Sequence, residues 1–385
     1  MLDPSQGIHK ILDVAIDGDR ISELGLGLTP QTEAREIDVR GKYVSPGLID
    51  LHGHWYLGSA FGIDPSICLA GGVTTAVDAG TAGFINFADF RRNQIDRSRE
   101  EVLAFVNIAA CGIPTNLMGE LEDLRMARPK ETLDVLLENR DIALGVKIRV
   151  GTMTGANSAK ALEYAAEAAR SAKLPLMVHI GLGADTAAVL RQLRPGDILT
   201  HCFQNRAESI AGAEKLMPEA VLARKEGIIF DVGHGCGSFS WDVARRSFEY
   251  DFYPDTISTD LHRYSIGRWA IDMPTTMSKF LHLGMTLDDV ILKSTWQPAK
   301  AIGRGQQLGT LRIGTVADIL VFELEQGEFL FEDTHLKIEK ASRRIKPALV
   351  IKAGQITNPS EVPKSLRRLY DCDYEHLKLV EEMAP

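Results

Sequence analysis

The sequence predicts an α/β fold in which parallel strands alternate with helices in a closed (β/α)8 barrel, a TIM barrel. Short apolar segments alternate with helical stretches such as 158–172, where alanine and leucine recur at helical spacing. This alternation is typical of βαβ units. In addition, several of the apolar segments have a histidine, lysine or aspartate near the carboxyl end, the end at which such barrels place their functional groups.

We expect the barrel to begin near Val44 and to contain eight strands. Outside it, residues 11–37, 309–322 and 348–356 show short alternating or apolar runs broken by Asp-Gly and Ala-Gly turn signals, which predict antiparallel strands. The tail from Asn358 is polar and helix-prone. The expected carboxyl ends of the eight barrel strands lie near His54, Gly80, Cys111, Val150, Gly181, Phe203, Gly235 and Asp260.

The composition excludes several classes of protein. The chain has 385 residues, of which 45% are apolar and 25% charged, enough for one large core and a smaller one. No apolar run approaches the roughly 18–20 residues that span a membrane, and the first residues lack a signal-peptide pattern, so a cytoplasmic location is expected. Five cysteines without paired spacing argue against a disulfide framework. The net charge of -9 disfavours a nucleic-acid partner.

The most informative motif is His52-Gly53-His54, which ends the apolar run 43–51. Alternation along a strand points both imidazoles to the same side, and such a pair can hold a metal ion. Two histidines at this spacing also arise by chance, so the pair alone leaves a metal site and an ordinary polar role equally open.

Four further residues change that balance. Each lies near the carboxyl end of a separate apolar segment, and the carboxyl ends of parallel barrel strands meet on one face. We therefore expect all of these side chains to converge with the histidine pair in one site. The four residues are Lys147, His179, His201 and Asp260.

With this ordered set, His-x-His, Lys, His, His and Asp, the chain resembles the binuclear-metal branch of the amidohydrolase superfamily, which includes dihydroorotase, the hydantoinases and related deacetylases. Two flanking motifs, Gly41–His52 and Gly309–Phe322, agree with the resemblance, which covers nearly the whole chain. The stretch Asp231–Trp241 is most similar to the dihydroorotase-like or deacetylase subgroup, whose studied members hydrolyse acetyl esters of R-configured α-hydroxy acids.

The resemblance implies a domain organisation. Residues 1–43 and 304–385 would form a composite small β-sandwich domain with a C-terminal tail, and residues 44–303 would form the barrel. Members typically carry an extra apolar strand before the segment equivalent to 2–7, so that strand is expected to be absent here or to lie upstream. Proteins of this kind commonly self-associate, and a homo-oligomer is therefore expected.

The resemblance also implies a pair of divalent metal ions. Zinc suits nitrogen and oxygen ligands at low coordination number, although manganese or iron can occupy the same ligands. Lys147 would bridge the two ions as a carbamate, N6-carboxylysine, formed from its uncharged amine and carbon dioxide; the alternative is an ion pair at the barrel mouth. The first ion would be bound by His52, His54 and Asp260, the second by His179 and His201, and both by Lys147.

The predicted function is hydrolysis of an ester or amide bond, such as an acetyl group, in a small carboxylate-bearing compound by a hydroxide that bridges the metals. Asp260 would pass the proton from the hydroxide to the leaving alcohol or amine; the alternative is that it serves as a ligand only. Cyclic-amide hydrolysis, as in dihydroorotase or hydantoinase, is the second candidate. A non-catalytic scaffold is the third, and the retained ligand set argues against it.

Substrate contacts are expected from two places. Alternation puts Arg149 on the same face as Lys147, where it can grip a carboxylate through two hydrogen bonds or form a structural ion pair. His234, in a glycine-rich stretch, can donate to substrate, hold a metal ligand or structure its loop, and Gly235 allows close approach of substrate to backbone. Further candidates for the pocket are His262, Tyr264 and Asn116, whereas His9, His282, His335 and His376 are expected to be structural.

Overall fold

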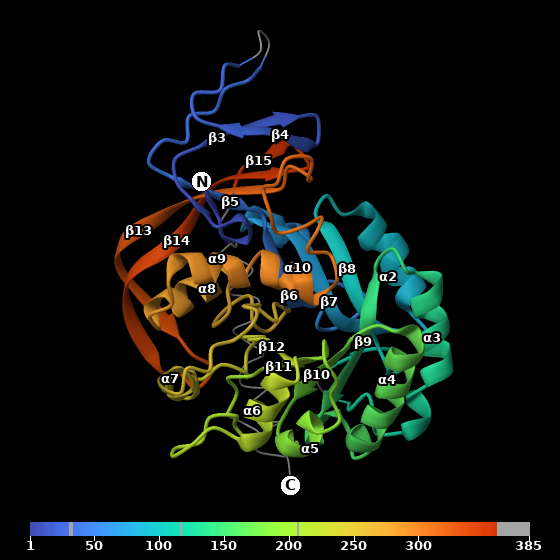
Figure 1. Ribbon diagram of the computed structural model, residues 1–385. Coiled ribbons are helices and arrows are strands. Elements are labelled where there is room, and N and C mark those ends of the chain that lie inside the picture. The colour runs from blue at the N-terminus through green and yellow to red at the C-terminus, as the bar shows by residue number, and fades with distance from the viewer. Residues whose placement is uncertain (31–33, 116–117, 206–207, 360–385) are drawn as a thin grey trace.

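The computed structural model describes residues 1–30, 34–115, 118–205 and 208–359. Its centre is a curved parallel sheet whose strands neighbour one another in chain order (Figure 1). This arrangement confirms the predicted α/β class. The seven strands are β6 (Leu48–Gly53), β7 (Val73–Gly83), β8 (Glu101–Asn107), β9 (Ala143–Val150), β10 (Leu176–Ile180), β11 (Ile198–Thr200) and β12 (Ile229–Phe230).

The eighth position of the barrel differs from the prediction of a regular strand. Residues 256–261 close the ring through two isolated parallel bridges, from Asp231 to Thr256 and from Gly53 to Leu261. The φ angle of 46° at Asp260 interrupts the extended conformation that a continuous ladder requires. The ring is therefore closed at this position by two isolated bridges and not by a continuous strand ladder. The residue at the backbone bend, Asp260, is a candidate metal ligand.

The start of the barrel also differs from the prediction. The segment expected to be one strand from Val44 is split, because β5 (Tyr43–Pro46) pairs antiparallel with β13 (Ile319–Glu332), and β6 begins only at Leu48. Gly47 lies at the break, and a Cβ there would stand 2.2 Å from Thr74 Oγ1. The close approach of a neighbouring side chain thus explains why a glycine separates the two elements.

Helices cover the outside of the parallel sheet (Figure 1). In α4 (Ser158–Ala172), Ala161, Leu162 and Ala165 are buried against the strands, as their helical spacing predicted. Four 3-10 turns lie at Pro4–Gln6, Ile95–Arg97, Leu124–Met126 and Thr152–Thr154. The helices are α1 (Ser66–Ala70), α2 (Phe87–Asn93), α3 (Pro129–Glu138), α4 (Ser158–Ala172), α5 (Thr186–Leu190), α6 (Pro218–Lys225), α7 (Trp241–Glu249), α8 (Met273–His282), α9 (Leu287–Lys293) and α10 (Trp296–Ala301).

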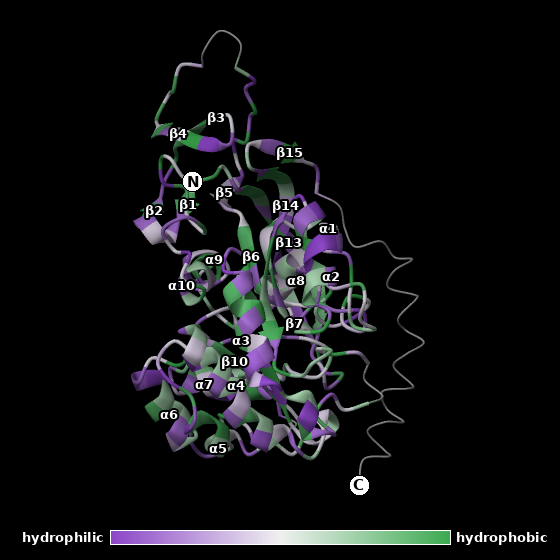
Figure 2. Ribbon diagram, turned by 90° about the vertical axis from the view of Figure 1, so that its right-hand side faces the viewer, coloured by the Kyte–Doolittle hydropathy of each residue, from purple (hydrophilic) through white to green (hydrophobic). Residues whose placement is uncertain are grey.

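Both ends of the chain contribute to an antiparallel β region, as predicted. Its main sheet has the order β15 (Gln355–Thr357), β14 (Ile338–Lys352), β13 and β5. A separate core of Ile21, Val44, Ile319, Ile351 and neighbouring apolar residues fills this region. Figure 2 shows apolar colouring along β6 and β7 in the central sheet. The remaining strands are β1 (Leu2–Asp3), β2 (Ile8–His9), β3 (Asp13–Asp17) and β4 (Arg20–Gly25).

The β13–β14 hairpin is much longer than its pairing with β5 requires. That pairing involves only Ile319–Phe322 of β13, and the rest of the hairpin runs past the side of the barrel (Figure 1). It packs there on α8, where Ile345 N donates to Ser278 Oγ at 2.9 Å. The hairpin therefore connects the antiparallel region to the barrel wall.

Among the described residues, no helix is both long and apolar enough to cross a membrane.

The packing of α8 can be tested at Phe280, which is fully buried and lies 5.8 Å from the ring of Phe239 and 6.2 Å from that of Phe203. Phe280→Ala should lower the free energy of unfolding by about 3–5 kcal/mol, because it leaves a cavity. Leu222→Ala, at a side chain that is 55% exposed, should change it by less than about 0.5 kcal/mol. Urea unfolding of both variants measures the difference, and equal midpoints would contradict the assignment of Phe280 to the core.

Candidate metal centre

The buried side chains of His52, His54 and Asp260 converge on one point, at the place where the first and last segments of the barrel meet. The Nε2 atoms of His52 and His54 lie 3.4 Å and 3.1 Å from Asp260 Oδ1. Within the described parts of the chain, these residues form the group of ligand-type side chains whose donor atoms all lie within 4.8 Å of one another. The sequence prediction that the His-x-His motif meets Asp260 is confirmed in position.

The ring of His52 is fixed by a chain of hydrogen bonds. Thr200 Oγ1 donates to Asp231 Oδ2 at 2.7 Å, so its oxygen accepts from His52 Nδ1 at 2.8 Å. Nδ1 therefore carries the proton, and Nε2 presents a lone pair toward Asp260. Asp231 is held in turn by hydroxyl donors from Thr256 and Ser258.

His54 is held in the same way by a second chain. The hydroxyl of Thr81 is hydrogen-bonded to the carboxylate of Asp78 and lies 2.7 Å from His54 Nδ1. Asp78 also accepts from the backbone N–H of Thr81 and of Trp55. Both histidines of the motif thus use Nδ1 toward the protein and direct Nε2 into the site, an arrangement typical of metal-ligating histidines.

His179 and His201 form a second pair. His201 Nδ1 donates to the carbonyl oxygen of Gly233 at 2.7 Å, which leaves His201 Nε2 to face His179 Nδ1 at 2.6 Å. A Cβ on Gly233 would stand 2.7 Å from His201 Nδ1, so glycine is required for this contact. Two imidazole nitrogens that face each other this closely need a shared proton or a cation between them.

Lys147 lies beside the first pair. It is fully buried, and its Nζ is 3.3 Å from His52 Nε2. Burial lowers the pKa of Lys147 to about 7, so the uncharged amine is accessible near neutral pH. A Cβ on Gly80 would stand 2.4 Å from Lys147 Cβ, which explains a glycine on the neighbouring strand.

The donor set as a whole fits divalent ions. Burial lowers the pKa values of His52, His54 and His179 well below the usual value, and that of His201 to about 4. The four imidazoles are therefore neutral near pH 7, as metal ligands must be. Together with one carboxylate and one lysine amine they offer the nitrogen and oxygen donors that zinc, manganese or iron accept.

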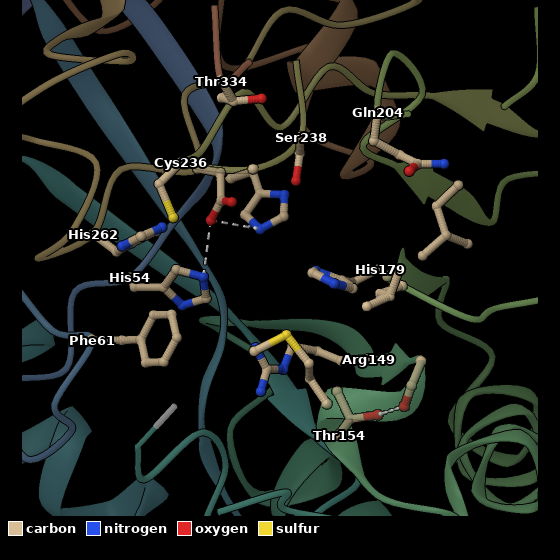
Figure 3. A pocket seen from close by; sticks show the side chains of 18 of the residues that line it. His54, Phe61, Arg149, Thr154, His179, Gln204, Cys236, Ser238, His262 and Thr334 are labelled. Carbon is tan, nitrogen blue, oxygen red and sulfur yellow. Dashed lines mark hydrogen bonds and ion pairs between the residues drawn. The ribbon is translucent and has the colours of Figure 1, made fainter. Parts of the chain in front are cut away.

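A cavity of about 330 Å³ opens above these residues (Figure 3). Its floor is polar and its upper walls carry apolar side chains from several loops. Three lining residues, Thr334, His335 and Leu336, come from the turn of the β13–β14 hairpin. The other lining residues are His52, His54, Phe61, Lys147, Arg149, Gly151, Met153, Thr154, His179, Ile180, Gly181, Leu182, Gln204, Cys236, Gly237, Ser238, Asp260, His262 and Trp269.

Arg149 lines the cavity and also forms the structural ion pair that was its alternative. Its Nε and Nη2 donate to the two carboxylate oxygens of Glu120 at 2.7 Å and 2.8 Å. Its guanidinium carbon lies 5.6 Å from the centre of the Phe61 ring. The Nε edge is thus occupied by Glu120, and a carboxylate ligand would have to use the Nη1 end of the guanidinium.

His234 and Gly235 lie behind the cavity and are not among its lining residues. Both ring nitrogens of His234 are engaged: Nδ1 donates to Gly235 O at 3.0 Å, and Nε2 accepts from Lys279 Nζ at 2.7 Å. A Cβ on Gly235 would stand 2.3 Å from Asp260 Oδ2. Gly235 therefore packs against Asp260, and the ring of His234 is held by Lys279 and by its own loop.

Several other expectations have different outcomes. His262 lines the cavity, whereas Tyr264 does not. His335, expected to be structural, lines the cavity because the hairpin turn brings it there. His9 pairs with Asp288 and His282 with Glu339. Asn116 and His376 lie outside the described residues.

Sequence reasoning missed the residues that hold the ligands from behind. Thr200 and Thr81 lie near the ends of their strands, Asp78 is buried within β7, and Asp231 is buried directly after β12. The only signal for Thr200 was its position directly before His201. Isolated polar residues inside apolar strands, such as the two aspartates, were the signal for the rest, since buried carboxylates need partners.

Comparison with known proteins identifies the family. A model of the amidohydrolase family matches residues 241–357. Deacetylases of Agrobacterium fabrum and Brucella anthropi are each 36% identical to this chain, over 92% and 91% of it and 88% and 89% of their own lengths. The chain therefore belongs to the amidohydrolase family, and it is a hydrolase. A crystal structure described as a dihydroorotase matches it with a TM-score of 0.86 and 34% identity, over 92% of this chain and 96% of its own.

The hydroxyl relay to His52 can be tested by Thr200→Val. Loss of the acceptor for Nδ1 releases the ring orientation and should weaken metal binding about 10–100-fold. Thr75→Val is the matched control, because the buried Thr75 hydroxyl has no hydrogen-bond partner among the described residues. Competition titration against a chelator measures both affinities. Equal affinities in the two variants would rule out the relay.

The buried ammonium of Lys279 predicts a pH dependence of stability. Burial lowers its pKa to about 7, whereas the unfolded chain keeps the usual value near 10.5. Between these values the unfolded state binds the additional proton, so stability rises with pH. Relative to Lys279→Met, wild-type protein should gain about 3 kcal/mol of unfolding free energy from pH 7 to pH 10. Urea unfolding across this range measures the gain, and parallel curves would refute the lowered pKa.

Proposed function

We propose that the protein hydrolyses an ester or amide bond between an acyl group, such as acetyl, and a small carboxylate-bearing compound. Two divalent ions, zinc in the first instance, would be held by the donor set described above, with Lys147 as a bridging carbamate. The observation that carries the proposal is the convergence of the neutral imidazoles of His52, His54 and His179, the Asp260 carboxylate and the buried Lys147 on a single cavity, with His201 Nε2 2.6 Å from His179 Nδ1. The similarity to two deacetylases supports the choice of an acyl bond.

The proposed roles follow from the position of each side chain. Bound ions would supply a water that loses its proton near neutral pH and would polarise the acyl oxygen. Asp260, whose Oδ1 faces the Nε2 atoms of His52 and His54, would accept the second proton of that water as its oxygen attacks the acyl carbon. It then returns that proton to the alkoxide or amine that leaves when the acyl bond breaks. The oxygen of the water thus ends in the released carboxylate, its first proton goes to solvent, and its second proton goes to the leaving group.

Arg149 supplies the proposed contact to the substrate carboxylate. It is the guanidinium that lines the cavity, and its ion pair with Glu120 fixes its plane. A carboxylate would be bound at the Nη1 end, with the Nε edge held by the protein. Because Glu120 offsets part of the charge of Arg149, we expect Arg149 to orient the substrate carboxylate more than to increase binding affinity.

A cyclic amide is the second candidate substrate, supported by the similarity to the structure described as a dihydroorotase. Ring opening would use the same ligands and the same proton transfer at Asp260. A panel of N-acyl amino acids, acetylated hydroxy acids and cyclic amides, in both configurations, distinguishes the two. Turnover confined to the open-chain acyl compounds would uphold the first proposal.

Lys147→Ala is the direct test of the metal centre. The variant should lose bound metal and lower kcat/KM by more than about 100-fold, and added short carboxylic acids such as formate should restore part of both. Lys293→Ala, at another largely buried lysine with a lowered pKa, is the control. Metal analysis alongside the assay provides the readout. Full metal content and activity without added acid would refute the bridging role.

A further inference from the structure

The turn of the β13–β14 hairpin, Asp333–Lys337, forms one wall of the cavity. Thr334, His335 and Leu336 are lining residues, although the strands that carry them belong to the antiparallel region and not to the barrel. Figure 3 shows Thr334 beside Ser238 and Cys236, on the wall opposite Arg149 and Thr154. We refer to residues 333–337 as the hairpin tip.

Hydrogen bonds fasten the hairpin tip to the segment that follows β12. Thr334 donates through N and Oγ1 to Phe239 O at 3.1 Å and 2.8 Å, and Phe239 N donates back to Thr334 Oγ1 at 3.2 Å. Asp333 Oδ2 accepts from Trp241 N at 3.1 Å, and Trp241 Nε1 donates to Lys337 O at 3.1 Å. The tip is thus part of the cavity wall and not a loose flap.

The hairpin tip also has a defined internal conformation. Asp333 Oδ1 accepts from the backbone N–H groups of His335 and Lys337 at 2.8 Å and 2.9 Å. These contacts hold Leu336 at a φ of 66°, a left-handed conformation that non-glycine residues rarely adopt. The turn therefore fixes the direction in which the Cα–Cβ bond of Leu336 leaves the backbone.

The base of the tip is pinned to the same network that positions the ligands. Lys279 Nζ donates to Glu332 O at 2.7 Å, to Trp269 O at 2.8 Å and to His234 Nε2 at 2.7 Å. Arg268 adds two bonds to the Glu332 carboxylate at 2.7 Å and 2.6 Å. The distance between the hairpin tip and the metal ligands is thereby fixed.

Two partly exposed leucines, Leu336 and Leu182, line this cavity. Leu336 is 45% exposed and Leu182 is 37% exposed, whereas His52, His54, Lys147 and Asp260 are buried. Partly exposed apolar side chains at the mouth of a polar-floored pocket are typical of a site that receives an apolar group of a ligand.

We propose that the hairpin tip determines substrate specificity, and that Leu336, together with Leu182, contacts an apolar side group on the carboxylate-bearing part of the substrate. This inference rests on the proposed function, because it assumes that the acyl bond lies at the buried ligands. The side group would then extend toward the mouth, where the two leucines lie. The preferred substrates are acyl compounds with a branched or otherwise bulky apolar side group.

The test compares Leu336→Ala with Leu330→Ala, a control at a 67% exposed leucine on the same hairpin that does not line the cavity. The substrates are matched pairs that differ only in the side group: N-acetylglycine with N-acetylleucine, and O-acetylglycolate with the O-acetyl ester of 2-hydroxy-4-methylpentanoate. Leu336→Ala should reduce kcat/KM about 10-fold for the branched member and leave the small member within about 2-fold. Leu336→Trp should narrow the mouth and reject the branched member more strongly.

The outcomes separate the two proposals. If wild-type protein hydrolyses the panel and Leu336→Ala behaves as Leu330→Ala does, the specificity role is wrong and the proposed function stands. If no acyl compound is hydrolysed, the proposed function fails, and calorimetric binding of glycolate and 2-hydroxy-4-methylpentanoate to the metal-loaded protein decides the inference. A wild-type preference for the branched acid that Leu336→Ala removes would uphold it; no preference would overturn it.

Discussion

The orientation of the imidazole rings is the constraint on which the site depends. Two chains run from a buried carboxylate through a threonine hydroxyl to a histidine Nδ1, and each turns one Nε2 inward. Asp78 lies on β7 and Asp231 directly follows β12, so the sheet itself sets the direction of the ligands. Because these partners are buried and mutually satisfied, water has little opportunity to replace them.

Lys279 connects the residues that hold the metal ligands to the segments that form the cavity wall. Its ammonium donates to His234, Trp269 and Glu332, which belong to three separate segments around the cavity. His234 in turn lies between Gly233, which orients His201, and Gly235, which packs against Asp260. A single fully buried side chain thus holds in register the ligand loop, the loop of Trp269 and the long hairpin.

The sequence was sufficient to predict the fold class and the residues that converge at the strand ends. Those predictions used spacing, and the strand-end positions of Lys147, His179 and His201 follow from local periodicity. The break at Gly47 and the bridged eighth position depend on contacts between distant segments, and local pattern does not report these. The roles of Thr200 and His335 could not be predicted for the same reason. Thr200 contacts His52 only because the barrel brings the ends of their two strands together, and His335 lines the cavity only because the hairpin turn brings it there.

The pairing of β5 with β13 has a consequence for how the chain acquires its structure. Tyr43–Pro46 lies directly before the first barrel strand, but its partner Ile319–Phe322 follows the whole barrel in sequence. During synthesis the barrel segments can therefore associate while β5 still has an open edge, and the cavity wall at 333–337 arrives later still. Long-range pairing of this kind is slow to form, so a hairpin that emerges only after the whole barrel both pairs with β5 and completes the mouth of the active site.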